Sequence, residues 1–269
     1  MKVHIVIPAR LASTRLPRKP LVEICGVPMI VRVAQQASLS QVDDVTVAVD
    51  SEEVLAVVKD AGLAAVMTNE HHASGSDRVY EVASGLDWSM DDLVVNVQGD
   101  EPLLPPAVID RLVAEMKARP AIEMGTVSEP IAGLDDFLDP NAVKVVSDTH
   151  DNALYFSRAP IAFPRNELQR WRDSAKSAEP RSDGNAEMAS LISTGMLRRH
   201  VGIYAFRVAG LAKFVQLSES RLERLEKLEQ LRWLEAGYDL FVLRHNAPIP
   251  GGVDTIEDLQ RVETILSSA

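Results

Sequence analysis

Four cationic side chains lie close together near the start of the chain, directly after a short apolar run. The segment HIVIPARLASTRLPRKPL, residues 4–21, contains Arg10, Arg15, Arg18 and Lys19. An arginine fork binds phosphate oxygens in pairs and a lysine adds a point charge, so this loop is suited to a polyanion. Neither Gly-x4-Gly-Lys-Ser/Thr nor Gly-x-Gly-x-x-Gly occurs here. Phosphate binding and a solvated loop with scattered cations therefore both stay open on spacing alone.

Two adjacent carboxylates end a second apolar run, in NVQGDEPLL, residues 96–104. Gln98, Asp100 and Glu101 follow the run, and Gly99 permits a tight turn. Mg²⁺ takes one or two protein carboxylates together with phosphate oxygens. An ordinary acidic turn is the alternative, but a cationic loop at a neighbouring strand end favours a magnesium site.

A third candidate segment is HHASGSDR, residues 71–78. Ser74, Gly75 and Arg78 suit a small polar loop at a helix N-terminus that recognises a base or a phosphate. The adjacent histidines are a poor zinc site, because neighbouring residues rarely converge on one ion and no cysteine or Glu-x-x-His lies nearby.

Two later segments leave alternatives open. Asp254, in PGGVDTIED, is either a second metal carboxylate or part of a helix start that is capped through Asp254 or Thr255. Glu229 and Gln230 lie in SRLERLEKLEQLRWL, where the 100° helical step places Glu229 near a leucine stripe. Glu229 is then either a surface residue with a buried stem or a substrate contact.

The elements that must position these residues alternate regularly in the first half. Runs rich in β-branched residues and apolar on both faces predict strands of a parallel sheet at residues 3–8, 44–50, 64–67 and 92–98. Helical patterns lie between them at residues 28–38, 51–61 (with Ser51 as N-cap), 76–86 and 106–118. This alternation predicts a doubly wound α/β sheet. Ligands then bind at the carboxyl ends of the strands, which points to loops 8–20, 68–78 and 98–104.

The second half is less regular. Strands are predicted over 123–131, 141–148 and 153–158, forming a small antiparallel excursion, and further strands over 198–207 and 237–245. Residues 166–197 are polar and uneven, which predicts a surface insertion or mobile loop. A Ser220-x-x-Glu223 capping box opens a helix that ends near Gly237, and a last helix occupies 252–266. Without an internal repeat or long linker, residues 1–269 are interpreted as one domain.

The totals narrow the class of partner. The 269 residues are 46% hydrophobic and 25% charged, with a net charge of −11, which argues against nucleic acid or an anionic membrane as partner. The single cysteine, Cys25, excludes an internal disulfide and indicates a reducing compartment; its apolar flanks predict an inert buried thiol. No apolar run reaches 18 residues and no signal peptide is recognisable, so we expect a cytoplasmic protein.

These motifs, taken together, resemble a known family. IPARLASTRLPRKPL, HASGSDR, VNVQGDEPLL, DPNAVKVV, ALYFSRAPI, RHVGIYAFR, SRLERLEKLEQLR and GVDTIEDLQRV occur in the order, and near the spacing, of the 3-deoxy-manno-octulosonate (Kdo) cytidylyltransferases. The resemblance covers essentially the whole chain. The arginine loop is shared with wider nucleotidyltransferases, whereas LEQLR, RHVGIY and SRAPI are narrower and point to the Kdo branch.

The resemblance implies an activity and an architecture. A Kdo cytidylyltransferase condenses CTP with Kdo, an acidic eight-carbon sugar, to give CMP-Kdo and pyrophosphate for lipopolysaccharide synthesis. The family has a Rossmann-like, mostly parallel sheet flanked by helices, requires Mg²⁺ and is usually a homodimer. Residues 153–207 would form a subregion for the sugar pocket or the dimer contact.

The resemblance also implies roles for individual residues. The nucleotide would be bound by Pro8, Ala9, Arg10, Arg15, Lys19, Ser74, Gly75, Arg78 and Gln98. The magnesium ligands would be Asp100 and Asp254, which together with Arg15 and Lys19 make the catalytic set. The sugar pocket would be lined by Arg158, His200, Tyr204, Glu229 and Gln230.

Two departures from the family pattern affect the substrate. Arg18 stands where the family usually has glycine, as a surface charge or a further phosphate contact, and segment 166–197 is longer than expected. A cytidylyltransferase for 8-amino-Kdo or sialic acid is therefore an alternative. From another class, a non-catalytic nucleotide-sugar-binding protein is the alternative, against which the joint presence of Lys19, Asp100 and Asp254 argues.

Overall fold

A computed structural model describes residues 1–13, 15–72, 74–175 and 183–268. The chain forms two compact units. The first comprises Met1–Gly125, Gly202–Gln216 and Ile249–Ala269, and the second comprises Thr126–Val201 and Leu217–Pro248. The interpretation of residues 1–269 as a single domain stays a prediction.

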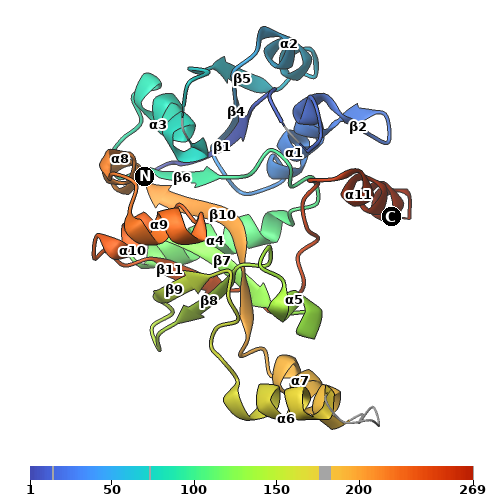
Figure 1. Ribbon diagram of the computed structural model, residues 1–269. Helices are drawn as coiled ribbons and strands as arrows, with labels where there is room; N and C mark the ends of the chain where they lie inside the picture. Colours follow the sequence, from blue (N-terminus) through green and yellow to red (C-terminus); the bar gives the residue numbers. More distant parts are fainter. Residues whose placement is uncertain (14, 73, 176–182, 269) are drawn as a thin grey trace. The chain divides into compact units, whose positions relative to one another are not determined.

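The first unit is built on a parallel sheet (Figure 1). Strand β1 (Val3–Ala9) pairs in parallel with β4 (Asp44–Val49) on one side and with β6 (Leu93–Asn96) on the other, and β4 pairs in parallel with β5 (Ala64–Met67). The last residues of β10 (Arg198–Arg207) add an antiparallel strand beside β6. These pairings confirm the predicted mostly parallel sheet. Its β-branched side chains are buried on both faces, as expected for a sheet covered on both sides.

Helices flank this sheet as predicted. The predicted ones are α1 (Met29–Ala37), α2 (Glu52–Asp60), α3 (Gly75–Gly85), α4 (Pro106–Ala118) and the C-terminal α11 (Ile256–Ser267). Helix α8 (Val208–Gln216) was not predicted. The hydroxyl of Ser51 accepts from the Glu53 N–H, which confirms the predicted N-cap of α2. Ser74 and Asp77 form a capping box at the start of α3, in which each side chain accepts the N–H of the other residue.

A short turn and a hairpin follow β1. The 3₁₀ turn η1 covers Lys19–Leu21, and β2 (Glu23–Ile24) and β3 (Val27–Pro28) form a two-stranded antiparallel sheet. Cys25 occupies the hairpin turn with φ 47°, and its side chain is exposed. The prediction of a buried thiol was therefore wrong: the apolar flanks belong to the paired strands, whereas the cysteine itself is at the tip of the turn.

The second unit contains the predicted antiparallel excursion. Strand β8 (Lys144–Ser147) pairs antiparallel with β9 (Ala153–Ser157) and, through Lys144 opposite Arg199, with the first residues of β10. In strand order β7 (Met124–Pro130) lies between β10 and β11 (Phe241–Arg244).

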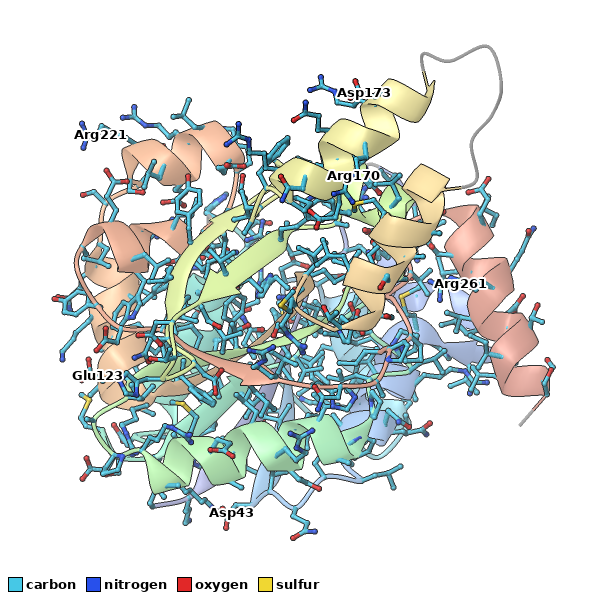
Figure 2. The ribbon with its side chains drawn as sticks, turned by 90° about the horizontal axis from the view of Figure 1, so that it is seen from below. Asp43, Glu123, Arg170, Asp173, Arg221 and Arg261 are labelled. Carbon is cyan, nitrogen blue, oxygen red and sulfur yellow. The ribbon has the colours of Figure 1, made fainter. Side chains whose placement is uncertain are left out.

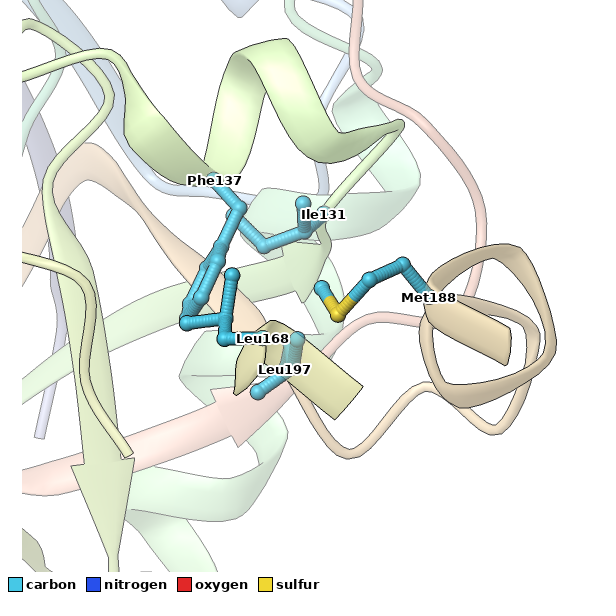
Figure 3. Packing of buried hydrophobic residues seen from close by; sticks show 5 residues of the cluster. All are labelled: Ile131, Phe137, Leu168, Met188 and Leu197. Carbon is cyan, nitrogen blue, oxygen red and sulfur yellow. The ribbon is translucent and has the colours of Figure 1, made fainter. Parts of the chain in front are cut away.

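Segment 166–197 was predicted to be a surface insertion or a mobile loop, and its described residues are mostly helical. Helices α6 (Arg165–Ala175) and α7 (Asp183–Ser193) follow the short α5 (Leu134–Leu138), and residues 176–182 lie outside the described part. A few widely spaced apolar side chains anchor the segment: Leu168, Met188 and Leu197 pack with Ile131 and Phe137 (Figure 3). Polar side chains such as Arg170 and Asp173 are exposed on α6 (Figure 2), which hides its helical pattern in the sequence.

The single helix predicted from the capping box to Gly237 is two helices. Helix α9 (Arg221–Glu226) does begin at the Ser220–Glu223 capping box, but it ends at Lys227 in the left-handed conformation, and α10 covers Leu231–Glu235. Gly237, with φ 83°, follows the end of α10 as expected. Among the described residues, no helix combines the length and the apolar content that a membrane crossing needs.

Candidate active site

A pocket of about 390 Å³ opens in the first unit where β1 and β6 end. Parallel strands end at a common edge, so the loops that follow them come together there. The pocket is lined by Pro8, Ala9, Arg10, Ala12, Ser13, Arg15, Lys19, Pro20, Gly75, Gln98, Gly99, Asp100 and Asp254. Most of the predicted nucleotide residues and both predicted magnesium ligands therefore meet in one cavity.

Lys19 joins the two carboxylates of this pocket. Its Nζ lies 2.5 Å from Oδ2 of Asp100 and 2.8 Å from Oδ1 of Asp254, and Nη2 of Arg15 lies 2.9 Å from the same Asp254 oxygen. Burial alone would lower the pKa of Lys19, but the two carboxylates more than offset it and the pKa is raised. The ammonium is therefore charged at neutral pH, so the pocket contains two cations, Lys19 and Arg15, in contact with two carboxylates.

Two glycines let these segments approach each other. A Cβ on Gly99 would lie 2.8 Å from the carbonyl oxygen of Pro8, and one on Gly252 would lie 2.8 Å from that of Asp100. The N–H of Val253 donates to the carbonyl of Asp100 over 2.9 Å. The backbone before α11 thus lies directly on the acidic turn after β6, which brings the Asp254 carboxylate to Asp100.

The contacts confirm a helix start that is capped through Thr255, and the metal role of Asp254 stays a prediction. Thr255 is the N-cap of α11, accepting from the Asp258 N–H, whereas Asp254 donates its own N–H to the Asp258 carboxylate over 3.1 Å. The side chain of Asp254 is left to face Lys19 and Arg15. Arg261 donates to the carbonyls of Gly251 and Gly252, at 3.0 and 2.9 Å, and so fixes the same segment.

Whether the pocket can hold a divalent cation depends on the side chains that could act as its ligands. Among the described residues, no group of three or more histidine, cysteine, aspartate or glutamate side chains converges, so a metal held by protein alone has no site there. Two carboxylates beside Arg15 and Lys19 fit magnesium, which keeps several water or phosphate oxygens as ligands. The residues present fit the ion that the family resemblance implies.

Three predicted contacts lie differently from the rest. The hydroxyl of Ser74 is engaged with Asp77 in the cap of α3, and Arg78 is fully buried and donates to Thr68 and Asp50. Gln98 lines the pocket, with its amide donating to the Gly202 carbonyl over 3.2 Å. Their assignments to nucleotide recognition stay predictions.

Sequence reasoning missed several residues that shape this pocket. Ala12 and Pro20 line it, and Asp50 accepts the N–H of Leu11 in the loop after β1. Asp50 directly follows β4, so the strand-end rule that selected the other loops could have selected it.

Arg18, which the sequence left open, forms an ion pair with Glu53 at the start of α2. The side chains of both residues are about half exposed, and Arg18 is absent from the lining of the pocket. The described contact of Arg18 is therefore with helix α2 and not with the pocket.

The residues predicted to line the sugar pocket are divided between the units, with Tyr204 in the first and the others in the second. Arg158 donates to the carbonyls of Glu226 (2.6 Å) and Pro140 (2.9 Å). His200 bonds to the hydroxyl of Thr126 at 2.8 Å, and burial lowers the pKa of His200 to about 3. The imidazole is therefore neutral at physiological pH.

Glu229 and Gln230 lie at the break between α9 and α10. Because Lys227 ends α9, the helical step that placed Glu229 beside the leucine stripe does not apply; its carboxylate lies 3.9 Å from Arg232. Gln230 is only 3% exposed, and its Nε2 has no hydrogen-bond partner among the described residues. A buried amide without a partner is costly, so it is suited to a ligand that accepts its hydrogen bonds.

Comparisons with known proteins agree with this geometry. Residues 4–241 match the family model described as cytidylyltransferase. The 3-deoxy-manno-octulosonate cytidylyltransferase of Saccharophagus degradans is 46% identical over 269 residues, covering 100% of both chains. That of Cellvibrio japonicus is 46% identical over 266 residues, covering 99% of this chain and 98% of its own. A solved CMP:2-keto-3-deoxy-manno-octonic acid synthetase complexed with CTP has a TM-score of 0.84 and 37% identity, covering 100% of this chain and 99% of that one.

The fold and the cationic pocket at the ends of β1 and β6 are those of a nucleotidyltransferase. The family match over most of the chain shows that it belongs to the cytidylyltransferases. Identity of 46% to full-length relatives places it, more narrowly, in the family of 3-deoxy-manno-octulosonate cytidylyltransferases.

Proposed function

We propose that the protein transfers CMP from CTP to Kdo and releases pyrophosphate. The observation that carries this proposal is the contact of Lys19 with both Asp100 and Asp254 in a pocket that also contains Arg10 and Arg15. The names of the full-length relatives and the structural neighbour complexed with CTP support the choice of both substrates. The product would serve lipopolysaccharide synthesis.

The chemistry follows from the residue types. The anomeric hydroxyl of Kdo attacks the α-phosphorus of CTP, its oxygen forms the new P–O bond, its proton passes to solvent, and the bond to pyrophosphate breaks. Negative charge grows on the phosphate oxygens, so fixed cations lower the barrier. Arg10, Arg15 and Lys19, which line the pocket, would supply this stabilisation.

Nucleotide binding would rearrange the ion pairs of the pocket. Lys19 contacts Asp100 and Asp254, and Arg15 contacts Asp254. A triphosphate is a stronger partner for both cations, which would turn toward phosphate oxygens and release the carboxylates. We propose Mg²⁺ as the cofactor, held by Asp100 and Asp254. When bound, it would withdraw charge from the phosphates and lower the pKa of the attacking hydroxyl.

In the second unit, we propose Arg158 and Gln230 as contacts to Kdo. The sugar acid offers a carboxylate to a guanidinium and hydroxyl oxygens to the buried Nε2 of Gln230, which has no partner in the described part of the chain. The roles of His200, Tyr204 and Glu229 toward the sugar stay predictions of the family resemblance.

The assembly and location of the protein are also proposals. A homodimer follows from the family resemblance, and sedimentation equilibrium would test it by the mass in solution. A cytoplasmic location suits an enzyme that consumes CTP, and the exposed thiol of Cys25 suits a reducing compartment.

Pyrophosphate release tests the proposed function. Purified protein with CTP and Mg²⁺ is offered Kdo, 8-amino-Kdo or sialic acid, and kcat/KM is compared. The account expects the highest value with Kdo. A higher value with either other sugar would overturn the choice of substrate, and CTP binding without pyrophosphate release from any sugar would identify a nucleotide-binding protein instead.

A further inference from the structure

We infer that Asp50 and Arg78 form a buried pair that positions the phosphate-binding loop after β1, so that Arg78 acts through Asp50 rather than on the nucleotide. Asp50 is a positioning residue in this account. The inference rests on the proposed function, because it concerns how the CTP site is held in place.

Asp50 connects the loop to the sheet. It follows β4 directly, its side chain is 11% exposed, and its Oδ1 accepts the N–H of Leu11 over 3.0 Å. Leu11 is the residue after Arg10, which lines the pocket. A single carboxylate oxygen therefore determines where the backbone turns as it leaves β1, and with it the position from which Arg10 reaches the pocket.

Arg78 fixes the other oxygen of the same carboxylate. Its Nη2 lies 3.2 Å from Oδ2 of Asp50, and its Nη1 donates to the hydroxyl of Thr68 over 2.5 Å. The hydroxyl of Thr68 in turn donates to the carbonyl of Val49 over 2.9 Å, so it presents a lone pair to Arg78. The network ties α3 and the ends of β4 and β5 to the loop after β1.

The burial of Arg78 argues against direct contact with the nucleotide. Its side chain is 0% exposed, and it does not line the pocket, whereas Gly75 of the same helix does. The Nη1 and Nη2 of this buried guanidinium are bonded to Thr68 and Asp50, and its Nε has no hydrogen-bond partner among the described residues. The two bonded nitrogens support the loop through Asp50.

Charge gives Asp50 a second effect on the loop. Burial lowers the pKa of Arg78, the carboxylate of Asp50 opposes this, and the positive charge of Arg10 lowers it further. Arg10 is thus close enough to repel Arg78, and Asp50 offsets that repulsion. Without the carboxylate, the repulsion between Arg10 and Arg78 would be offset only by Glu81, which would disfavour the position of Arg10 that the His72 carbonyl fixes.

The test compares Asp50→Asn, Arg78→Gln and the double variant. CTP affinity is measured by calorimetry without sugar, alongside kcat, the KM for each substrate, and Tm. Asp50→Asn should weaken CTP binding about tenfold, as expected for coupled buried groups. The KM for Kdo should change less than about twofold.

The double variant should bind CTP more tightly than Asp50→Asn alone, because an amide pair can keep the bond to Leu11 without leaving a buried guanidinium unpaired. Should Asp50→Asn be too unstable to purify, the same test is made between the double variant and Arg78→Gln. The double variant should then bind CTP at least as tightly as Arg78→Gln, because the amide that replaces the Asp50 carboxylate does not leave a buried carboxylate without its cation.

Asp92→Asn is the matched control. Asp92 is equally buried, with 8% of its side chain exposed, and accepts the N–H of Lys2 at the opposite end of β1 over 2.6 Å. It should lower Tm without changing CTP affinity. The inference would be overturned, and the proposed function left standing, if the losses of CTP affinity in the two single variants multiply in the double variant. Normal CTP affinity in Asp50→Asn would have the same consequence. Failure of the wild-type protein to bind CTP would overturn the proposed function and the inference together.

Discussion

Replacing Lys19 by methionine should change two properties of the active site in opposite directions. The substitution keeps an unbranched side chain of nearly the same length and removes the charge that Asp100 and Asp254 share, at 2.5 and 2.8 Å. The carboxylates then repel each other in the free protein, and a divalent cation becomes the best available partner for them. In the reaction, the same substitution removes a cation that stabilises charge on the phosphates.

The size of each effect follows from the geometry. Two carboxylates that flank one nitrogen lie roughly 5 Å apart, where full charges at an effective dielectric constant of about 20 interact by about 3 kcal/mol. Asp100 is 32% and Asp254 44% exposed, so screening by water reduces the effect to about 1 kcal/mol. Mg²⁺ should therefore bind the CTP-free variant about fivefold more tightly than wild type. Loss of a donor to the developing charge should lower kcat about 10²–10³-fold.

Calorimetric titration of Mg²⁺ and a pyrophosphate-release assay measure the two effects. Lys213→Met is the matched control, because Lys213 forms an ion pair with Glu123 at 2.7 Å elsewhere in the same unit. It should leave both Mg²⁺ affinity and kcat unchanged. The reasoning is refuted if Lys19→Met binds Mg²⁺ no more tightly than wild type, or if its kcat stays close to the wild-type value.

Three further predictions follow from individual contacts. Gln230→Met should leave Tm unchanged or raise it, because the substitution removes a buried Nε2 that has no partner in the described part of the chain. The same substitution should raise the KM for Kdo about tenfold. An unchanged KM would show that Gln230 is not part of the sugar site. Because the pKa of His200 falls to about 3 on folding, the unfolded chain binds the proton more readily, and the free energy of unfolding should fall by about 1–2 kcal/mol from pH 7 to pH 5. Urea unfolding should show a smaller fall in His200→Gln, and equal falls in both proteins would contradict the assigned shift. Arg18→Gly should leave the KM for CTP within about twofold of wild type, because an exposed pair with Glu53 contributes little; a large increase would make Arg18 a phosphate contact.

Much of the first unit could be predicted from the sequence because its physical signals are local. Strands such as β1 and β4 are apolar on both faces, and helices such as α2 begin at recognisable caps. Parallel strands also place their following loops at one edge. Lys19 lies in the loop after β1 and Asp100 in the turn after β6, so this rule predicts that the two residues lie near each other.

Other features depend on partners that are distant in the sequence. Helices α6 and α7 are held by a few apolar side chains that pack on Ile131 and Phe137, so the segment itself looks too polar to fold. The break after α9 coincides with Glu226, whose carboxylate accepts from Ser157 and from the N–H of Arg158. Neither contact leaves a periodic signal in the sequence.

The burial of Arg78 belongs to the same group. Its place in HASGSDR suggests a ligand contact, whereas the structure directs it to Asp50 and Thr68. The motif shows which residue types are present. The direction in which a side chain points depends on its position on helix α3, where Gly75 lines the pocket and Arg78 does not.

The most direct test of the central claim is a ³¹P NMR time course with CTP, Kdo and Mg²⁺. The account predicts that pyrophosphate and the phosphodiester of CMP-Kdo appear in equal amounts, and that Asp254→Asn slows both to the same extent. Hydrolysis of CTP without a sugar phosphodiester, or full activity of the Asp254→Asn variant, would contradict it.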